Sequence, residues 1–164
     1  MTVKENKVKE IMGNEVFCIF PDQTVFDASV LMATKGIGTL PVTKEDGTLV
    51  GILTDRDIVI RCNALGKDQR KTKIYECMSV NPVRTVPSTT LPDAIFLMSE
   101  YGIRRLPIVE NDKLIGIISM SDIAKVSDKC PNEKHPYDSC ILLEFTRGLQ
   151  KTSHLAHSCD SCAI

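Results

Sequence analysis

The sequence predicts an α+β protein built from two tandem copies of a β-α-β-β-α unit, packed about a pseudo-twofold axis. We expect small mixed sheets and a C-terminal tail that contains cysteine and histidine. Three observations support this. An internal repeat covers most of the 164 residues. Each copy combines helical spacing of apolar residues with short β-type runs between turn residues. One copy alone buries too little surface, so two are expected to share a core.

The repeat begins where KEIM, residues 9–12, is matched by YECM, residues 75–78. PDQTVFDASVLMATKGIGTLPV from Pro21 is then matched by PSTTLPDAIFLMSEYGIRRLPI from Pro87. The offset stays constant until the extra Gly47 of the first copy has been passed. We therefore expect a first repeat in residues 1–66, a second in residues 67–127 and a tail in residues 128–164.

Each element of the first copy has a local signal. A short helical turn near Val8–Met12 precedes the extended run EVFCIF. Thr24 is expected to cap a helix together with Asp27, and that helix ends near Gly36. The strand TLPVT, a tight turn at EDGT and the strand LVGILT follow, and a second helix begins at Asp55.

The second copy repeats this order with RRLPIV, a turn at END, LIGIIS and a helix from Met120. The linker NALGKDQRKTK, residues 63–73, is polar and is expected to cross the surface between the copies.

Composition is that of an ordinary globular protein, with 43% hydrophobic and 25% charged residues. No apolar run is long enough to span a bilayer, and MTVKENKVKE lacks the apolar core of a signal peptide, so we expect a cytoplasmic protein without a membrane partner. A net charge of −1 and the absence of Trp argue against a nucleic-acid partner. The seven cysteines are expected to be reduced thiols, with Cys18, Cys62 and Cys77 in the core.

The most similar stretches of the two copies, GILTDRD and GIISMSD, lie where a strand enters a helix. Thr54 and Ser119 precede Asp57 and Asp122 by the spacing of a helix capping box, which needs no ligand. The same groups also suit a binding site, because a carboxylate accepts hydrogen bonds from ribose hydroxyls and a helix start attracts phosphate. Both interpretations stay open, since one residue can cap and bind.

These residues make the chain resemble the cystathionine-β-synthase (CBS) domain pairs, also called Bateman modules. The resemblance covers roughly residues 8–126 and rests on Gly-hydrophobic-x-Thr/Ser-x-x-Asp in both copies, with GIGTLPV and GIRRLPI upstream. It implies a regulatory protein that is not an enzyme and needs no cofactor. Such a protein binds AMP, ADP, ATP or S-adenosylmethionine in two clefts between the repeats. It also implies a homodimer that passes the ligand state to an effector protein.

By this resemblance, Asp57 and Asp122 hold ribose, with Thr54 and Ser119 beside the ribose or the phosphate. Adenine is expected between apolar residues, and phosphate near basic ones. The apolar candidates are Phe20, Ile37, Val86 and Ile103, and the basic candidates are Arg56, Arg104 and Arg105. The arginines differ between the copies. If they converge on one cleft, we expect one tight site for a phosphorylated ligand and one weak or empty site.

No Walker loop and no Gly-x-Ser-x-Gly elbow occurs, and His135, His154 and His157 lie outside the repeats, so catalysis in the clefts is not expected. The apolar run ILLEFTRGLQ in the tail is expected either to pack onto its own repeats or to contact another subunit or an effector.

The end of the tail offers a different function. His154, His157, Cys159 and Cys162 are ligands that suit zinc, copper or an iron–sulfur cluster. Zinc-ligand pairs usually have a longer spacer, so these four ligands would hold one metal only with a contorted backbone. Cys130, His135 or Cys140, or a partner chain, could instead complete such a site. The alternatives are a tail without metal and a redox dithiol. The rival interpretation is therefore a metal-binding or redox-responsive protein, with zinc or iron at the tail and the repeats as a dimer scaffold.

Overall fold

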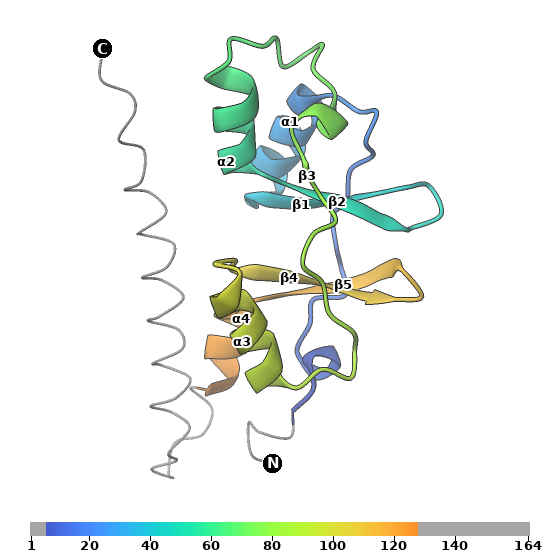
Figure 1. The fold of residues 1–164 in the computed structure, drawn as a ribbon, viewed down its shortest axis with the longest axis vertical. Coiled ribbons are helices and arrows are strands. Elements are labelled where there is room, and N and C mark those ends of the chain that lie inside the picture. The colour runs from blue at the N-terminus through green and yellow to red at the C-terminus, as the bar shows by residue number, and fades with distance from the viewer. Residues whose placement is uncertain (1–5, 128–164) are drawn as a thin grey trace, which may run out of the picture. The chain divides into compact units, whose positions relative to one another are not determined.

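The computed structural model describes residues 6–127, with side chains described to residue 125. It confirms an α+β fold with two copies of one unit (Figure 1). The chain forms two compact units whose limits differ from those of the sequence repeats. The Asp57 unit comprises residues 15–82 and 109–115, and the Asp122 unit comprises residues 6–14, 83–108 and 116–127.

Helix α1 (Val25–Lys35) of the Asp57 unit begins and ends where the sequence predicts. Oγ1 of Thr24 accepts a hydrogen bond from the Asp27 N–H at 3.1 Å, and Oδ2 of Asp27 accepts one from the Thr24 N–H at 2.9 Å. Gly36 ends the helix in the left-handed conformation, φ 64°, which glycine adopts without a steric penalty. The helix buries Val25, Ala28 and Met32 at helical spacing.

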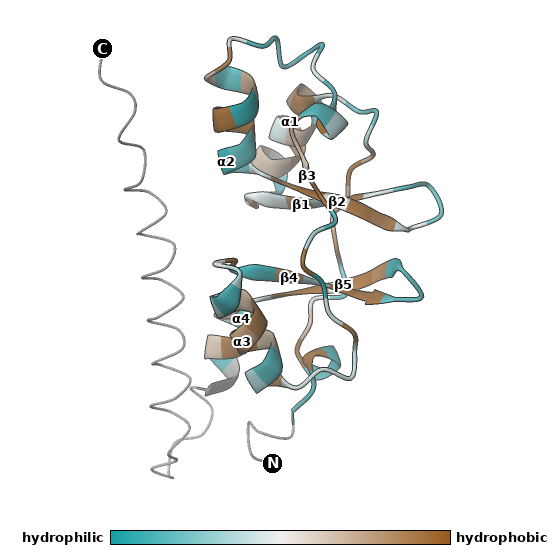
Figure 2. Ribbon diagram, viewed as in Figure 1, coloured by the Kyte–Doolittle hydropathy of each residue, from teal (hydrophilic) through white to brown (hydrophobic). Residues whose placement is uncertain are grey.

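The sheet of the Asp57 unit is antiparallel, in the order β1 (Thr39–Thr43), β2 (Leu49–Thr54) and β3 (Ser79–Val80). Figure 2 shows hydrophobic residues along these strands and hydrophilic ones at the hairpin turn. The turn at EDGT is confirmed, with Gly47 at φ 85°.

The run EVFCIF was predicted as extended backbone, and it contains no regular strand. Within it only Ile19 forms a bridge, a parallel one to Val42, which makes the sheet locally mixed. Ile19 donates to the Pro41 carbonyl at 3.1 Å and accepts from the Thr43 N–H at 3.0 Å. Continuing this ladder toward Glu15 would require an N–H at position 41, and proline has none.

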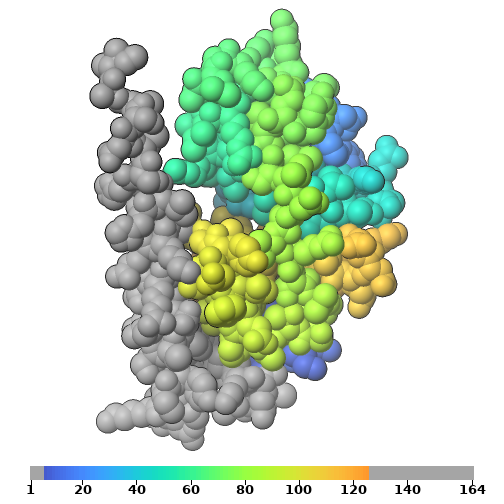
Figure 3. All heavy atoms as spheres, viewed as in Figure 1, coloured from blue at the N-terminus to red at the C-terminus, as the bar shows by residue number. Residues whose placement is uncertain are grey.

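Strand β2 leads directly into α2 (Asp55–Ile58), which continues as the π-helical turn η2 (Val59–Asn63). The exposed side chains of α2 and η2 form the teal-green surface in Figure 3, whereas Ile58 and Cys62 are buried. A 3-10 helix, η3 (Ile74–Glu76), precedes β3.

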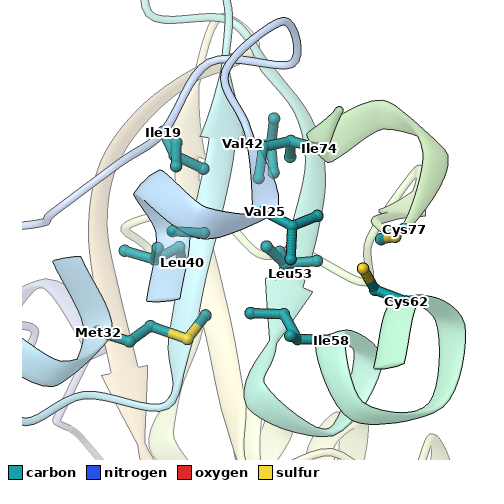
Figure 4. Packing of buried hydrophobic residues seen from close by; sticks show 11 residues of the cluster. Ile19, Val25, Met32, Leu40, Val42, Leu53, Ile58, Cys62, Ile74 and Cys77 are labelled. Atoms are coloured by element: carbon teal, nitrogen blue, oxygen red, sulfur yellow. The ribbon is translucent and has the colours of Figure 1, made fainter. Parts of the chain in front are cut away.

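The core of the Asp57 unit lies between the sheet and these helices (Figure 4). Cys62 and Cys77 are fully buried in it with their thiols side by side, as the sequence predicts, whereas Cys18 is half-buried. Full burial of one aliphatic side chain contributes about 1.5–3 kcal/mol. The buried cluster consists of Ile19, Val25, Ala28, Met32, Leu40, Val42, Leu53, Ile58, Cys62, Ile74 and Cys77.

The second repeat has the same arrangement, with α3 (Leu91–Glu100), a hairpin of β4 (Arg105–Glu110) and β5 (Lys113–Ser119), and α4 (Met120–Ser127). Residues 109–115 of this hairpin belong to the Asp57 unit, and the other residues of these elements belong to the Asp122 unit. The predicted turn at END is confirmed, since Asn111 and Asp112 have φ 51° and 63°. Thr85 forms the parallel bridge that corresponds to Ile19, here to Ile108. The buried residues include Val8, Leu91, Ala94, Ile95, Met98, Leu106, Ile108, Ile118 and Ile123.

The short 3-10 helices explain why units and repeats differ. Helix η1 (Val8–Glu10) packs in the Asp122 unit, where the Val8 N–H donates to the Thr89 carbonyl at 2.9 Å. The equivalent Ile74 N–H of η3 donates to the Gln23 carbonyl at 3.0 Å. Each 3-10 helix therefore completes the unit that contains the α-helices of the other repeat.

Candidate functional site

Thr54 and Asp57 form a complete capping box at the start of α2. Oγ1 of Thr54 accepts a hydrogen bond from the Asp57 N–H at 3.1 Å. Oδ2 of Asp57 accepts hydrogen bonds from the N–H and the hydroxyl of Thr54, at 2.9 and 2.7 Å. The box satisfies backbone groups that the start of a helix leaves without a partner, so the capping interpretation is confirmed.

Ser119 and Asp122 form the same arrangement at the start of α4. The Asp122 N–H donates to the Ser119 hydroxyl oxygen at 3.3 Å. Oδ2 of Asp122 accepts from the Ser119 N–H at 3.0 Å and from its hydroxyl at 2.6 Å. The two repeated stretches thus fold into equivalent structures.

A capping box alone does not mark a binding site. Thr24 and Asp27 form one at α1, and at α3 the Asp93 N–H donates to Oγ1 of Thr90, whose hydroxyl donates to Asp93 Oδ2. Neither of those helices carries the glycine-containing motif. What distinguishes the pairs at α2 and α4 is the environment of the second carboxylate oxygen.

In each of these pairs, Oδ1 of the aspartate faces a basic side chain of the same helical segment. Oδ1 of Asp57 lies 3.4 Å from Nη2 of Arg61, and Oδ1 of Asp122 lies 3.4 Å from Nζ of Lys125. The aspartate side chains are 16% and 34% exposed. Because a carboxylate oxygen can accept two hydrogen bonds, each Oδ1 keeps capacity for a hydroxyl of a ligand.

The sequence interpretation missed Arg61 and Lys125, although their spacing of four and three residues from an aspartate on a helix is a usable signal. Nη1 of Arg61 also donates to the Cys77 carbonyl at 2.9 Å and to the Ser79 hydroxyl at 3.1 Å. Arg61 therefore joins Asp57 to the segment from η3 to β3 and fixes the orientation of its carboxylate.

Hydrogen bonding favours the ionised form of Asp122. Burial is the largest single influence and raises its pKa, but the hydroxyl and N–H of Ser119 and the Lys125 ammonium together lower the pKa below its usual value. Asp122 is therefore a carboxylate at neutral pH, the form that accepts hydrogen bonds from hydroxyls.

The glycine of the motif has a packing role. A Cβ on Gly51 would approach Sδ of Met78 to 2.5 Å, and one on Gly116 would approach Sδ of Met12 to 2.6 Å. Each methionine thus packs directly on the backbone of the strand that precedes a capping box. This contact explains why the glycines recur together with the methionines of KEIM and YECM.

The structure separates the four apolar candidates into two pairs. Ile37 and Ile103 are half-buried and directly precede the residues that contact the starts of α2 and α4. Phe20 and Val86 are exposed. Phe20 follows Ile19, which bridges to Val42, and so lies toward the end of β1 opposite to Thr39, the partner of Thr54. A role for Phe20 or Val86 in holding adenine stays a prediction.

Phe17 was not among the predicted adenine-binding residues, although it lies nearer than Phe20 to the end of β1 that contains Thr39. It packs against the core, and Nζ of Lys35, the last residue of α1, lies 4.4 Å from the centroid of its ring. The chain then passes through Gly36 and Ile37 to Gly38, whose carbonyl accepts from the Asp55 N–H at 3.1 Å. The sequence signal for Phe17 was an aromatic residue in the predicted extended run EVFCIF, two positions before Ile19.

The three predicted arginines occupy different positions. Arg56 is the exposed second residue of α2. Arg104 is exposed, and its carbonyl accepts from the N–H of Met120, the first residue of α4. Arg105 begins β4. The structure therefore brings Arg104 to the start of α4, where Ser119 and Asp122 lie.

The predicted metal ligands His154, His157, Cys159 and Cys162 lie outside the described residues. Within residues 6–127, no three His, Cys, Asp or Glu side chains come together as a metal ion requires. The same part of the chain contains no helix that is both long and apolar enough to cross a membrane.

Comparison with known proteins identifies both repeats. The family model "CBS domain" matches residues 8–63 and 74–129. The CBS domain-containing protein YhcV of Bacillus subtilis (strain 168) is 42% identical over 119 residues, which cover 73% of this chain and 84% of that protein.

Three solved structures are similar in fold and sequence. CBSX2 in complex with AMP is 32% identical with a TM-score of 0.67, covering 75% of this chain and 96% of that one. The CBS domain pair of protein MJ0100, in complex with 5′-methylthioadenosine and S-adenosyl-L-methionine, is 27% identical with a TM-score of 0.67, covering 77% and 98%. Hypoxic Response Protein I with two coordinated zinc ions is 31% identical with a TM-score of 0.69, covering 73% and 98%.

The family match spans most of the described residues and places one domain on each repeat. This chain therefore belongs to the CBS domain family, as a tandem pair of CBS domains.

Proposed function

We propose that this protein is a regulatory ligand sensor that binds adenosine nucleotides (AMP, ADP, ATP or S-adenosylmethionine) at Asp57 and Asp122. One observation carries the proposal. In each unit the aspartate uses Oδ2 for the capping box, while Oδ1 lies beside a basic side chain and keeps capacity to accept hydrogen bonds. The similar structures with AMP and with S-adenosylmethionine support the adenosine part of the proposal.

The chemistry of ribose fits this arrangement. Its vicinal hydroxyls are hydrogen-bond donors, and one of them can donate to the acceptor position that Oδ1 keeps beside the basic side chain. The capping bonds hold that carboxylate in one orientation before the ligand arrives, which lowers the entropic penalty of binding. Thr54 and Ser119 contribute by fixing the aspartates, because their hydroxyl protons are already donated to Oδ2.

The proposed role is regulatory and not catalytic. It requires binding groups alone, needs no cofactor, and transmits occupancy of the sites to an effector protein. We further propose a homodimer. Val30 on α1 and Phe96 on α3 occupy equivalent positions of the two repeats and are 48% and 59% exposed, as expected of residues in a protein contact.

Calorimetric titration with AMP, ADP, ATP and S-adenosylmethionine tests the proposal, with 2′-deoxy-AMP as the probe for the ribose contact. We expect at least one adenosine compound to bind, and 2′-deoxy-AMP to bind at least about tenfold more weakly than AMP. A ligand at a hundredfold excess over Kd should stabilise the fold by about 2.7 kcal/mol, which is several degrees in Tm.

Aspartate variants separate capping from binding. Asp57→Asn and Asp122→Asn should each remove one binding event, and the double variant should remove both. Asp27→Asn is the matched control, because Asp27 forms the same box with Thr24 at α1. If the site variants lose stability as the control does and still bind every ligand like the wild type, the aspartates are caps alone.

A second candidate function is metal binding, which the similarity to a structure with two coordinated zinc ions favours. The ligands would be His154, His157, Cys159 and Cys162, with zinc or iron as the metal. Elemental analysis of protein purified without a histidine tag tests this function. Stoichiometric metal that is lost in a Cys159→Ser, Cys162→Ser variant would support it, and metal-free protein would dismiss it.

A further inference from the structure

The two proposed sites share a backbone contact that lies next to the ligand-binding aspartate. In the Asp57 unit the Asp55 N–H donates to the Gly38 carbonyl at 3.1 Å. In the Asp122 unit the Met120 N–H donates to the Arg104 carbonyl, also at 3.1 Å. Both contacts join the residue after the capping Thr or Ser to the segment that enters the first hairpin strand. The four residues therefore occupy equivalent places in two equivalent structures.

The side chains at this contact reverse their charge between the units. The Asp122 unit pairs a cationic residue, Arg104, with the uncharged Met120. The Asp57 unit pairs Gly38, which has no side chain, with the carboxylate of Asp55. The formal charge at this contact is thus +1 beside Asp122 and −1 beside Asp57.

The Asp55 carboxylate lies beside Gly38, in the space that a side chain at position 38 would need. A Cβ on Gly38 would lie 2.6 Å from Oδ2 of Asp55 and 3.1 Å from its Cγ. Oδ1 of the same carboxylate accepts a hydrogen bond from the Arg56 N–H at 2.7 Å. The carboxylate therefore fills the space in which the other unit places the first side-chain carbon of Arg104. An arginine at position 38 and Asp55 in this conformation exclude each other.

Two arginines of the same helical segment, Arg56 and Arg61, follow Asp55 in the chain. Arg61 is held by Asp57, the Cys77 carbonyl and the Ser79 hydroxyl, so its charge is already engaged. Arg56 follows Asp55 in the chain, and both residues are exposed to solvent, where their charges are screened alike. Affinity for an anionic ligand, measured with and without the Asp55 carboxylate, shows the effect of this charge.

We propose that Asp55 sets the chemical class of ligand at the Asp57 site, an inference that rests on the proposed function. The Asp57 site takes an adenosine compound whose 5′ substituent is neutral or cationic, such as a thioether or a sulfonium. The Asp122 site, with Arg104 and without an acidic neighbour at position 120, takes a 5′-phosphorylated one. Asp55 acts by repelling the negative charge of a phosphate and attracting a positive charge on the ligand.

The assignment of a ligand class to each site is tested in the full-length protein by removing one binding site at a time. In the Asp122→Asn background, the remaining site should bind 5′-methylthioadenosine and S-adenosylmethionine at least about tenfold more tightly than AMP. Adding Asp55→Asn, which removes the charge and keeps the shape, should strengthen AMP binding by about tenfold and weaken S-adenosylmethionine binding. Binding of the uncharged 5′-methylthioadenosine should stay within about twofold.

The Asp57→Asn background provides the matched control. There, Asp55→Asn should leave AMP affinity within about twofold, while Arg104→Ala should weaken it by about tenfold. In the Asp122→Asn background, the effect of Asp55→Asn on AMP should shrink as salt rises from about 0.05 to about 0.5 M, since it is electrostatic.

The outcomes separate this inference from the proposed function. If AMP binds the Asp57 site at least as tightly as 5′-methylthioadenosine does, or if Asp55→Asn leaves AMP affinity unchanged there, Asp55 does not set the ligand class, although the sensor function stands. If none of these adenosine compounds binds the wild-type protein, the proposed function fails and this inference fails with it.

Discussion

The thioether of Met78 lies on the backbone of Gly51, so close that a Cβ on the glycine would approach Sδ to 2.5 Å. Met12 and Gly116 have the same relationship in the other unit, at 2.6 Å. These contacts connect the segment that carries a short 3-10 helix to the strand that leads into a capping box. Residues that are identical in the two repeats therefore pack on the strands that lead to Asp57 and Asp122.

Replacing either glycine by alanine should therefore destabilise the fold. Gly51→Ala and Gly116→Ala each force a methionine away from its strand, an overpacking effect that typically reduces the free energy of unfolding by about 1–3 kcal/mol. Urea denaturation measures this loss. Gly13→Ala is the control, because a Cβ there would meet only the Ile117 carbonyl oxygen at an ordinary 3.8 Å.

A second variant shows whether the methionine is the cause. Adding Met78→Ala to Gly51→Ala should cost less than the sum of the two single changes, because the clash is absent once the thioether is removed. If the two losses in the free energy of unfolding are additive, the destabilisation by Gly51→Ala has a cause other than the contact with Met78.

Acid should weaken the fold through the capping carboxylates. The pKa of Asp27 is lowered, first by a hydrogen bond from the Thr24 hydroxyl and then by one from its N–H, and the pKa of Asp122 is lowered as described above. An aspartate of the unfolded chain has a pKa of about 3.9. The stability that each carboxylate contributes is thus complete above that pH and is lost as the pH falls through the lower pKa of the folded state.

Unfolding by urea at constant ionic strength, between about pH 5 and about pH 2, measures this loss. We expect the midpoint to fall with pH, and to fall less steeply in Asp27→Asn and in Asp122→Asn, because asparagine does not titrate. If both variants show the same pH dependence as the wild type, Asp27 and Asp122 are not the carboxylates whose protonation weakens the fold.

The sequence predicted those elements whose signals are local. Thr24 and Asp27 mark the start of α1, and Gly36 marks its end. The Asp-Gly turn separates β1 from β2. Each of these features was predictable because it depends on a few adjacent dihedral angles. The Thr54 and Asp57 box was foreseen for the same reason.

Features that depend on distant partners were not foreseen. The parallel bridge at Ile19 stays single because Pro41, on another segment, lacks an N–H. The packing of η1 in the Asp122 unit could not be predicted from the sequence repeat. The constant spacing between matching residues does not show which copy a segment contacts. The carboxylate of Asp55 over Gly38 likewise joins residues from two separate stretches.

The buried thiols should be unreactive in the folded protein. Burial, followed by the neighbouring Cys62, raises the pKa of Cys77, and burial also raises the pKa of Cys18 despite a hydrogen bond from Thr43. Since the thiolate is the reactive form, iodoacetamide at about pH 8 should label Cys62 and Cys77 at least about tenfold faster in urea than in buffer. Peptide mass spectrometry distinguishes these sites from the four cysteines of the tail. Equal rates in both conditions would mean that the segment around η2 and η3 opens readily.

Charge on the exposed faces of α1 and α3 should break the proposed homodimer. Val30 and Phe96 are large, exposed apolar residues at equivalent positions of the two repeats, and burying them against another copy would remove apolar surface from water. Val30→Glu with Phe96→Glu should convert a dimer to a monomer in light scattering while the circular dichroism spectrum is unchanged. Val80→Glu is the control, because Val80 is 63% exposed on β3 and away from both helices in sequence. A wild-type monomer, or a dimer that persists in the double variant, would show that these residues do not hold two copies together.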